Sequence, residues 1–384
     1  MREVRLGPAF DLLAAYDPEG GAFFERRGIG AATDGSVLEV VPNEAVALLR
    51  ERGAGSVGIG AIPFAGGEGT VRIAGRAVHR TEPGETRLVG SRGGFDRLAG
   101  AAVPHHAFAE AQLHEVPSPD GYADAVAIAV ARISTGVLRK VVLARTIEVE
   151  AGRRLDPRLL AHRLRAVNPD AYTFAFPTDR GPLVGASPEL LVSRIGREVR
   201  SNPLAGSAPR SGDPEEDRAN ADGLAASAKN REEHALVVDA VAQTLRPVCE
   251  SLAWDPAPVL LETPNVWHLS TRFRGILRDP APTVLDLVAA LHPTPAVGGT
   301  PTGAALSAIG ELEPFDRGYY AGPVGWVDGD GDGEWAIALR CALLEGSCAT
   351  LFAGAGIVAD SEPAAEVDET ARKFRAFLDA LRWG

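Results

Sequence analysis

Short segments rich in β-branched and aromatic residues, separated by turns that contain glycine or proline, recur along most of this 384-residue chain. The run KVVLARTIEVE at residues 140–150 is typical of a strand. Residues 322–359 alternate strand and turn signals. Because tight turns join antiparallel neighbours, whereas parallel strands need long crossovers, this pattern predicts an antiparallel sheet.

A few segments carry a helical signal instead. Apolar residues recur at helical spacing in residues 225–249, and helices are also predicted at residues 121–136 and about 364–381. A shorter helix over residues 44–55 is stopped by glycine. Antiparallel strands and helices without a low-complexity linker predict an α+β fold, in which large antiparallel sheet layers are flanked by helices.

The formal net charge of −12 restricts the partners of the chain. Non-specific binding to nucleic acid or to an anionic membrane needs a basic face, so neither partner is expected. The N-terminus shows no signal peptide, and the longest apolar stretches, such as residues 125–131, are far shorter than the roughly 20 residues that cross a bilayer. We therefore expect a cytoplasmic protein that binds any anionic substrate through a local cluster of cations.

Two local patterns are expected to be structural. Cys249, Cys341 and Cys348 form no CxxC pair, which favours free thiols in a reducing compartment over a disulfide. The acidic run at residues 328–334 begins like a calcium loop, but Leu339 stands where the closing glutamate is needed. A hairpin turn is the better interpretation of this run.

Two predicted helices each present a pair of oxygen-bearing side chains three residues apart. Glu366 and Glu369 share one side of the last helix, and Asn230 and Glu233 share one side of the helix at residues 225–249. If these sides face each other, they offer the hard oxygen ligands that Mg²⁺ prefers. Otherwise they are solvated helix faces with salt bridges, which is the commoner arrangement for glutamate on a helix.

Two residues have sequence surroundings that suit proton transfer. Lys140 begins a very apolar strand, where partial loss of water favours the neutral amine and hence a general base. Alternatively, its side chain extends from the strand end to water. Glu189 lies between Pro188 and a Leu-Leu-Val run, so its pKa is expected to be raised, as suits a proton donor. A capping or ion-paired glutamate is the alternative.

Three further residues are candidates for a binding site. Arg340 interrupts an apolar strand, so it needs an anionic partner, which either the protein or a substrate can supply. His268 and His292 either line a cavity or are hydrogen-bonded histidines of the core.

The order of the segments along the chain is more specific than any one of them. From about residue 121 to the C-terminus, the sequence resembles the chorismate-utilising enzymes, a family that includes isochorismate, salicylate, anthranilate and aminodeoxychorismate synthases. The matching segments are KVVLAR, SPELLV, NPLAGSAPR, KNREEH, VWHLSTRF, HPTPAVGGTP, FDRGYYAGPVGW, WAIALRCA, GAGIVADSEP and EVDETARK. The resemblance implies a single domain over residues 1–384, with a variable scaffold part at 1–115 and a catalytic core at 120–384.

The resemblance also implies the roles of the chemical groups. Glu233 and Glu369 match direct Mg²⁺ ligands, and Glu366 matches a carboxylate that holds metal-bound water. Asn230 stands where family members often have an acidic residue. Lys140 matches the base that activates water at C2 of chorismate, and Glu189 matches the acid that protonates the departing C4 hydroxyl.

A further set of positions matches residues that contact the substrate, which is the dianion chorismate. The residues that match positions near the enolpyruvyl carboxylate are Arg340 and Tyr320, and the remaining carboxylate-binding set is matched by Lys373, Gly354 and Gly356. His268 matches a histidine that lines the pocket. The loop beside the ring is matched by Gly206 and Ser207.

The resemblance points most closely to isochorismate synthases of the siderophore type. Their reaction can feed siderophore and 2,3-dihydroxybenzoate, salicylate or menaquinone biosynthesis, so the pathway stays open. Ala205 replaces the loop lysine of aminodeoxychorismate synthases, and the chain has no tryptophan-feedback motif or glutaminase domain. We therefore expect a monomer without a glutaminase subunit. A salicylate synthase, which also eliminates pyruvate, and a catalytically silent chorismate-binding homologue remain the alternatives.

Overall fold

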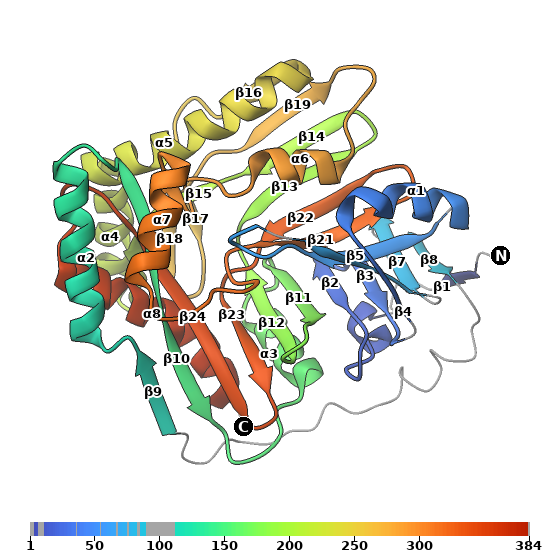
Figure 1. The fold of residues 1–384 in the computed structure, drawn as a ribbon, viewed down its shortest axis with the longest axis horizontal. Helices are drawn as coiled ribbons and strands as arrows, with labels where there is room; N and C mark the ends of the chain where they lie inside the picture. The colour runs from blue at the N-terminus through green and yellow to red at the C-terminus, as the bar shows by residue number, and fades with distance from the viewer. Residues whose placement is uncertain are drawn as a thin grey trace.

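Three antiparallel sheets form the framework of the protein. The computed structural model describes residues 4–6, 11–35, 37–53, 55–66, 68–74, 77–82, 85–89 and 112–382. In this part of the chain every strand pairing is antiparallel. The predicted α+β class is confirmed, because helices and antiparallel sheets make up the molecule together (Figure 1).

The largest sheet runs from N-terminal strands to the strands of the closing segment. Its order is β1 (Val4–Leu6), β8 (Glu85–Val89), β7 (Ala77–Glu82), β3 (Ile29–Thr33), β2 (Phe23–Arg26), β11 (Tyr172–Pro177), β12 (Pro182–Ser187), β23 (Cys341–Glu345), β24 (Cys348–Ile357), β10 (Lys140–Glu150) and β20 (Gly299–Thr300), with β9 (Gln112–Val116) also paired to β10.

The other two sheets are smaller. The order in one is β16 (Cys249–Trp254), β19 (Phe273–Leu277), β14 (Glu198–Asn202), β13 (Leu190–Ile195), β22 (Gly333–Ile337), β21 (Pro323–Asp328), β5 (Val57–Ala61), β6 (Thr70–Ala74) and β4 (Val37–Val40). The third sheet consists of β15 (Leu204–Pro209), β18 (Val266–Ser270) and β17 (Val259–Glu262).

The helices lie mainly at one end of the molecule. Figure 1 shows α2, α4, α5, α7 and α8 near β10 and β24, whereas the N-terminal strands lie at the opposite end. The helices are α1 (Pro42–Arg52), α2 (Pro119–Ser134), α3 (Pro157–Val167), α4 (Pro214–Ala226), α5 (Ala228–Leu245), α6 (Val284–Leu291), α7 (Thr302–Leu312) and α8 (Pro363–Arg382), with short 3₁₀ turns η1 (Leu12–Ala15) and η3 (Arg246–Val248). No helix in the described ranges is long and apolar enough to cross a membrane.

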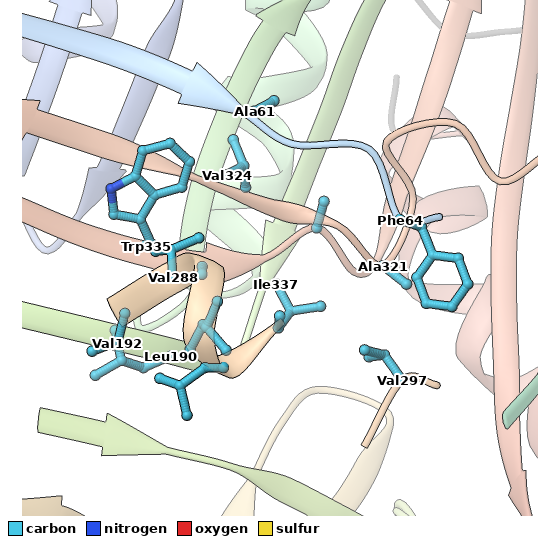
Figure 2. Packing of buried hydrophobic residues seen from close by; sticks show 14 of the residues in the cluster. Ala61, Phe64, Leu190, Val192, Val288, Val297, Ala321, Val324, Trp335 and Ile337 are labelled. Atoms are coloured by element: carbon cyan, nitrogen blue, oxygen red, sulfur yellow. The ribbon is translucent and has the colours of Figure 1, made fainter. Parts of the chain in front are cut away.

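Two hydrophobic clusters hold these layers together. The first combines residues of both large sheets, including Phe174 of β11 and Ile59 of β5. Figure 2 shows how Val288 of α6 covers Leu190, Val192 and Trp335 in this cluster. The second cluster packs α3 and α8 on the largest sheet through residues such as Leu160 and Phe377. Helix α8 is therefore fixed against the sheet that carries β10 and β24.

Most predicted elements are confirmed, and one helix boundary is corrected. The helix predicted at residues 225–249 is α5, which begins at Ala228 and ends at Leu245. Ser227 is extended, and its side chain accepts a hydrogen bond from the backbone N–H of Asn230, so it ends α4 and caps α5. Pro247 lies in η3 beyond the helix, and Cys249 already begins β16.

The hairpin prediction for residues 328–334 is also confirmed. Strands β21 and β22 pair directly on either side of the turn. Asp328 Oδ1 accepts hydrogen bonds from the backbone N–H groups of Asp330 and Asp332, and Asp332 pairs with Arg194. These carboxylates therefore stabilise the turn. The three cysteines are free as expected, although Cys348 is only partly buried.

The core assignment makes a prediction about stability. Ile59 is fully buried between the sheets, whereas Ile195 is 52% exposed at the end of β13. We expect Ile59→Ala to lower the free energy of unfolding by about 2–5 kcal/mol, because it removes buried methyl groups and leaves a cavity. The same substitution at Ile195 should cost well under half as much. Urea denaturation of both variants measures the difference, and equal losses would contradict the packing described here.

Candidate active site

A cavity opens where the largest sheet meets the three-stranded sheet and the helices α5 and α8. The lining includes many residues singled out from the sequence: Glu189, Gly206, Ser207, Glu233, His268, Tyr320, Arg340, Gly354, Gly356, Glu369 and Lys373. Residues that are far apart in the sequence thus meet around one space.

The helices α5 and α8 bring three glutamates to this region, and each is paired with a lysine. Glu233 Oε1 lies 3.0 Å from Lys140 Nζ. Glu366 Oε1 accepts a 3.0 Å hydrogen bond from Lys229 Nζ, and Glu369 Oε1 accepts one of 2.6 Å from Lys373 Nζ. The alternative of solvated helix faces is therefore wrong for Glu233 and Glu366, which are only 6% and 2% exposed.

Glu366 and Glu369 influence each other electrostatically. Burial raises the pKa of Glu366, and the charge of Glu369 raises it further, against the opposing effect of Lys229. Burial also acts to raise the pKa of Glu369, but the Lys373 ammonium and hydrogen bonds from Lys373 and Ser207 hold that pKa below its usual value. Two carboxylates so close together would be stabilised by an additional positive charge.

The chemistry of these donors fits a hard cation. Carboxylate oxygens are the groups that Mg²⁺ prefers, and Glu233 and Glu369 both line the cavity. Within the described ranges, however, no three His, Cys, Asp or Glu side chains converge closely enough to form a metal centre. Lysine ammonium groups supply the positive charge in this arrangement, so a cation would have to compete with them.

Lys140 is fully buried, which excludes the alternative that its side chain extends to water. It is not part of the cavity surface but lies directly behind it. A Cβ built on Gly356 would come within 2.1 Å of Glu233 Oε1 and 3.1 Å of Lys140 Cε. Only glycine at position 356 therefore lets Lys140 and Glu233 approach strand β24 so closely. Apart from this ion pair, Nζ has no hydrogen-bond partner in the described part of the chain.

Glu189 has the perturbed carboxyl group that its sequence surroundings predict. Its residue is only 4% exposed, and burial raises the pKa of its side chain to about 7, although a hydrogen bond with the Leu204 backbone and the charges of Lys140, Arg340 and Lys373 oppose the rise. A carboxyl group with this pKa is substantially protonated at neutral pH. It can therefore donate a proton into the cavity.

Arg340 and His268 form a linked pair at the cavity wall. Arg340 Nη2 lies 3.3 Å from His268 Nε2, and His268 Nδ1 lies 3.3 Å from the Gly206 carbonyl oxygen. Because a guanidinium can only donate, Nε2 accepts, and Nδ1 carries the proton that is donated to Gly206. Burial and the charge of Arg340 lower the pKa of His268 to about 3, so the imidazole is neutral.

Arg340 itself has no carboxylate partner. Burial lowers its pKa, and none of the described carboxylates forms an ion pair with it. Its backbone has a φ of 50°, which is unusual for a non-glycine residue and directs the chain at the point where β22 gives way to β23. The sequence left open whether the anion comes from protein or ligand, and this geometry favours a ligand.

The remaining residues shape the walls. Tyr320 is buried and stacks on Phe352, with ring centroids 4.9 Å apart, and burial raises its pKa. Lys373 Nζ donates a 2.8 Å hydrogen bond to the Gly354 carbonyl oxygen. A Cβ on Gly354 would approach the Tyr320 hydroxyl to 3.1 Å, so glycine makes room there.

Asn230 and His292 lie outside the cavity lining. Asn230 Nδ2 donates to Ser227 Oγ at 2.9 Å, and its side chain packs against Gly206, which has a φ of 76°. Asn230 thus supports strand β15 at Gly206. The loop expected at Gly206 and Ser207 is wrong, because both residues lie in this strand, where its register against β18 is irregular. His292 Nε2 lies 3.1 Å from the Phe64 carbonyl oxygen in the core, so of the two candidate histidines only His268 belongs to the site.

Sequence reasoning missed some residues of the site. Lys229, the partner of Glu366, is the second residue of α5, and its role depends on a contact with α8. The apolar part of the lining was missed as well, namely Val142, Leu204, Ala296, Val297, Ala321 and Leu339. Small apolar residues in strands and loops carry no sequence signal that distinguishes a cavity wall from a core.

Comparisons with known proteins agree with this geometry. A family model described as chorismate binding enzyme matches residues 95–382. The isochorismate synthase DhbC of Bacillus subtilis is 49% identical over 276 residues, which cover 70% of this chain and 69% of that protein. The isochorismate synthase EntC of Escherichia coli K12 is 43% identical over 267 residues, covering 69% of this chain and 68% of that protein.

The fold is shared with a solved structure. The menaquinone-specific isochorismate synthase MenF from Escherichia coli superposes with a TM-score of 0.85 at 25% sequence identity, covering 99% of this chain and 94% of that chain. The similarity therefore extends over the N-terminal strands that the family model does not include.

The raised pKa of Glu189 predicts a pH-dependent cost of folding. The unfolded chain releases the Glu189 proton near pH 4.5, whereas the folded protein retains it up to about pH 7. Wild type should therefore lose stability relative to Glu189→Gln as pH rises through this window, by on the order of 3 kcal/mol in total. Urea denaturation of both proteins at pH values from about 4 to about 8, which bracket that window, measures the difference in their free energies of unfolding. A difference that does not change with pH would contradict the buried neutral carboxyl.

Proposed function

The chain belongs to the family of chorismate-binding enzymes, and from this premise we propose that it converts chorismate to isochorismate. The observation that carries the proposal is the guanidinium of Arg340, which faces the cavity without a carboxylate among the described residues. A chorismate carboxylate supplies the anion that this group lacks. The neutral His268 orients the guanidinium and contributes no competing charge.

Binding positions the dianion by charge. Arg340, with Tyr320 beside it, holds the enolpyruvyl carboxylate. The ring carboxylate lies toward Lys373 and the glycine-lined surface at Gly354 and Gly356, where the absence of side chains permits close approach. Gly206 and Ser207 of strand β15 lie beside the ring.

The chemical step is an exchange of hydroxyl groups through the ring double bonds. Lys140, as a free amine, accepts a proton from the water whose oxygen forms a bond to C2. The double bond shifts as the C4–O bond breaks, and Glu189 gives its proton to the departing hydroxyl, which leaves as water. One water is consumed and one is released, and a proton transferred from Lys140 back to Glu189 restores the starting state.

The position of Lys140 sets a condition for this step. Its Nζ lies 3.0 Å from Glu233 Oε1, and its side chain packs against Gly356; both Glu233 and Gly356 line the cavity. Exchange of that ion pair for another contact of Glu233 frees the amine to meet the water.

We propose Mg²⁺ as the cofactor, which Glu233 and Glu369 would hold directly, while Glu366 would act on it through water. When bound, the ion supplies positive charge for a substrate carboxylate and offsets the repulsion among the glutamates. The lysines that now pair with these glutamates hold the carboxylates in place before the ion arrives.

The destination of the product is a finer proposal. The relatives that match this chain include a menaquinone-specific isochorismate synthase and a vibriobactin-specific one. We propose that isochorismate from this enzyme feeds 2,3-dihydroxybenzoate and siderophore formation, with salicylate or menaquinone as the other outlets. We further propose that the enzyme acts as a monomer. It needs no glutaminase subunit, because the reaction uses water and not ammonia.

A product assay tests the function directly. The purified protein is incubated with chorismate and Mg²⁺, with and without EDTA, and the products are resolved by chromatography. Isochorismate alone, lost on chelation and restored by excess Mg²⁺, is the expected result. Equal amounts of salicylate and pyruvate would instead make the protein a salicylate synthase, and binding of chorismate without turnover would make it a silent homologue.

Replacing Lys140 separates chemistry from binding. We expect Lys140→Ala to lower kcat by about 10²–10⁴-fold, the usual contribution of a general base, while KM changes little. Arg139→Ala, at the exposed neighbouring position, is the matched control and should retain activity. Steady-state kinetics of both variants, after thermal unfolding has shown that they are folded, decide the matter. Near-normal kcat in Lys140→Ala would exclude Lys140 as the base.

A further inference from the structure

One edge of β10 is paired in two separate pieces. Strand β24 pairs with β10 from Val141 to Glu150. On the opposite edge, β20 pairs with Lys140 and Val141, and β9 pairs with β10 from Thr146 onward. Residues 142–145 have no strand beside them on this edge in the described structure, although the stretch lies next to the cavity.

Two charged side chains take the place of the missing strand. Glu313 Oε1 accepts a 2.7 Å hydrogen bond from the Ala144 backbone N–H. Arg317 Nη2 donates a 2.8 Å hydrogen bond to the Val142 carbonyl oxygen. Arg317 Nε also donates to Glu313 Oε2 at 2.8 Å, so the two residues form a closed unit with the strand.

The same pair reaches the other walls of the cavity. Arg317 Nη1 donates a 2.9 Å hydrogen bond to the Val297 carbonyl oxygen. The backbone carbonyl oxygen of Arg317 accepts a 2.8 Å hydrogen bond from the Tyr320 backbone N–H. The Arg317 guanidinium lies 4.2 Å from the centre of the Phe64 ring. Val142, Val297 and Tyr320 all line the cavity. Arg317 thus joins three walls from different parts of the sequence, two through its guanidinium and the wall at Tyr320 through its backbone carbonyl oxygen.

Stability alone does not account well for this arrangement. Both side chains are 3% exposed, and removing two charges from water costs several kcal/mol per ion, so apolar residues of similar volume would often serve the fold as well. Apolar residues could not, however, bind the Val142 and Val297 carbonyls and the Ala144 amide. The pair is suited to fixing backbone positions.

We propose that Glu313 and Arg317 are positioning residues for the isomerisation. They fix the position of the β10 segment that begins with Lys140 relative to the cavity wall at Ala296–Val297 and to Tyr320. The Lys140 amine then meets the attacking water at the correct place. This inference rests on the proposed function. Neither residue lines the cavity, and both act through the backbone groups that they bind.

The molecule offers a matched control in its other large sheet. Arg194 Nη1 donates to Asp332 Oδ1 at 2.6 Å and to the Asp330 carbonyl oxygen at 2.8 Å, at the hairpin between β21 and β22. This pair is also largely buried and also joins a side-chain ion pair to backbone, but it does not contact the cavity lining.

The test compares Arg317→Lys and Glu313→Gln with Arg194→Lys and Asp332→Asn. Lysine keeps the charge but cannot bind both carbonyls in the fork geometry, and glutamine keeps the acceptor for Ala144 but removes the charge. We expect kcat for isochorismate formation to fall by about 10–100-fold in the first two variants with KM changed less than about threefold, since misplacement of this kind can cost 10²-fold. The control variants should lose stability but retain kcat.

Hydrogen–deuterium exchange provides a readout that does not need activity. If Glu313 and Arg317 position the cavity walls, backbone amides in peptides covering residues 140–147 and 294–300 should exchange faster in Arg317→Lys than in wild type. Amides elsewhere in the sheets should keep their slow exchange. Wild-type kcat in folded Arg317→Lys, or a loss of activity that follows only the folded fraction as in the controls, would overturn the inference. So would exchange that rises uniformly.

The two proposals fail in distinguishable ways. A wild-type protein that makes no isochorismate overturns the proposed function, and the exchange pattern then decides on positioning of the cavity walls. If Arg317→Lys does not fold, Glu313→Gln carries the kinetic test, because it retains the acceptor for the Ala144 amide.

Discussion

The cavity depends on the pairing of buried carboxylates with lysines. An unpaired charge this far from water would cost several kcal/mol, so each glutamate that faces the site from α5 or α8 must have a partner. Lys140 of β10 pairs with Glu233 of α5, and Lys229 of α5 pairs with Glu366 of α8. The ion pairs therefore connect sheet to helix and helix to helix, and they give the site its shape as well as its charge.

Against this background of paired charges, two groups stand out as functional. Arg340 keeps a positive charge without a carboxylate, and Glu189 avoids a negative charge because burial favours its protonated form. A dianionic ligand therefore meets an available cation and a neutral acid in the same cavity. Charge complementarity of this kind explains how a chain with a net charge of −12 can bind an anionic substrate.

Local signals allowed much of the site to be predicted from sequence, and long-range contacts account for the rest. The spacing of Glu366 and Glu369 and the apolar surroundings of Glu189 are properties of a few neighbouring residues, and both are matched by the structure. The break between α4 and α5 depends on one capping serine within an otherwise helical pattern. The ion pair of Lys229 and Glu366 joins residues 137 positions apart, and no periodicity indicates such a contact.

The N-terminal part of the chain is more than a cover for the sheets. It supplies β2 beside β11 and β5 beside β21, so both large sheets are continued by strands from before residue 90. The Phe64 ring packs on the guanidinium of Arg317, and a side chain on Gly322 would collide with the Ile62 carbonyl oxygen. Substitutions in the outer strands can be absorbed locally. Changes at Ile62 or Phe64, in contrast, would act on the cavity wall through Gly322 and Arg317, because packed contacts transmit displacement to their neighbours.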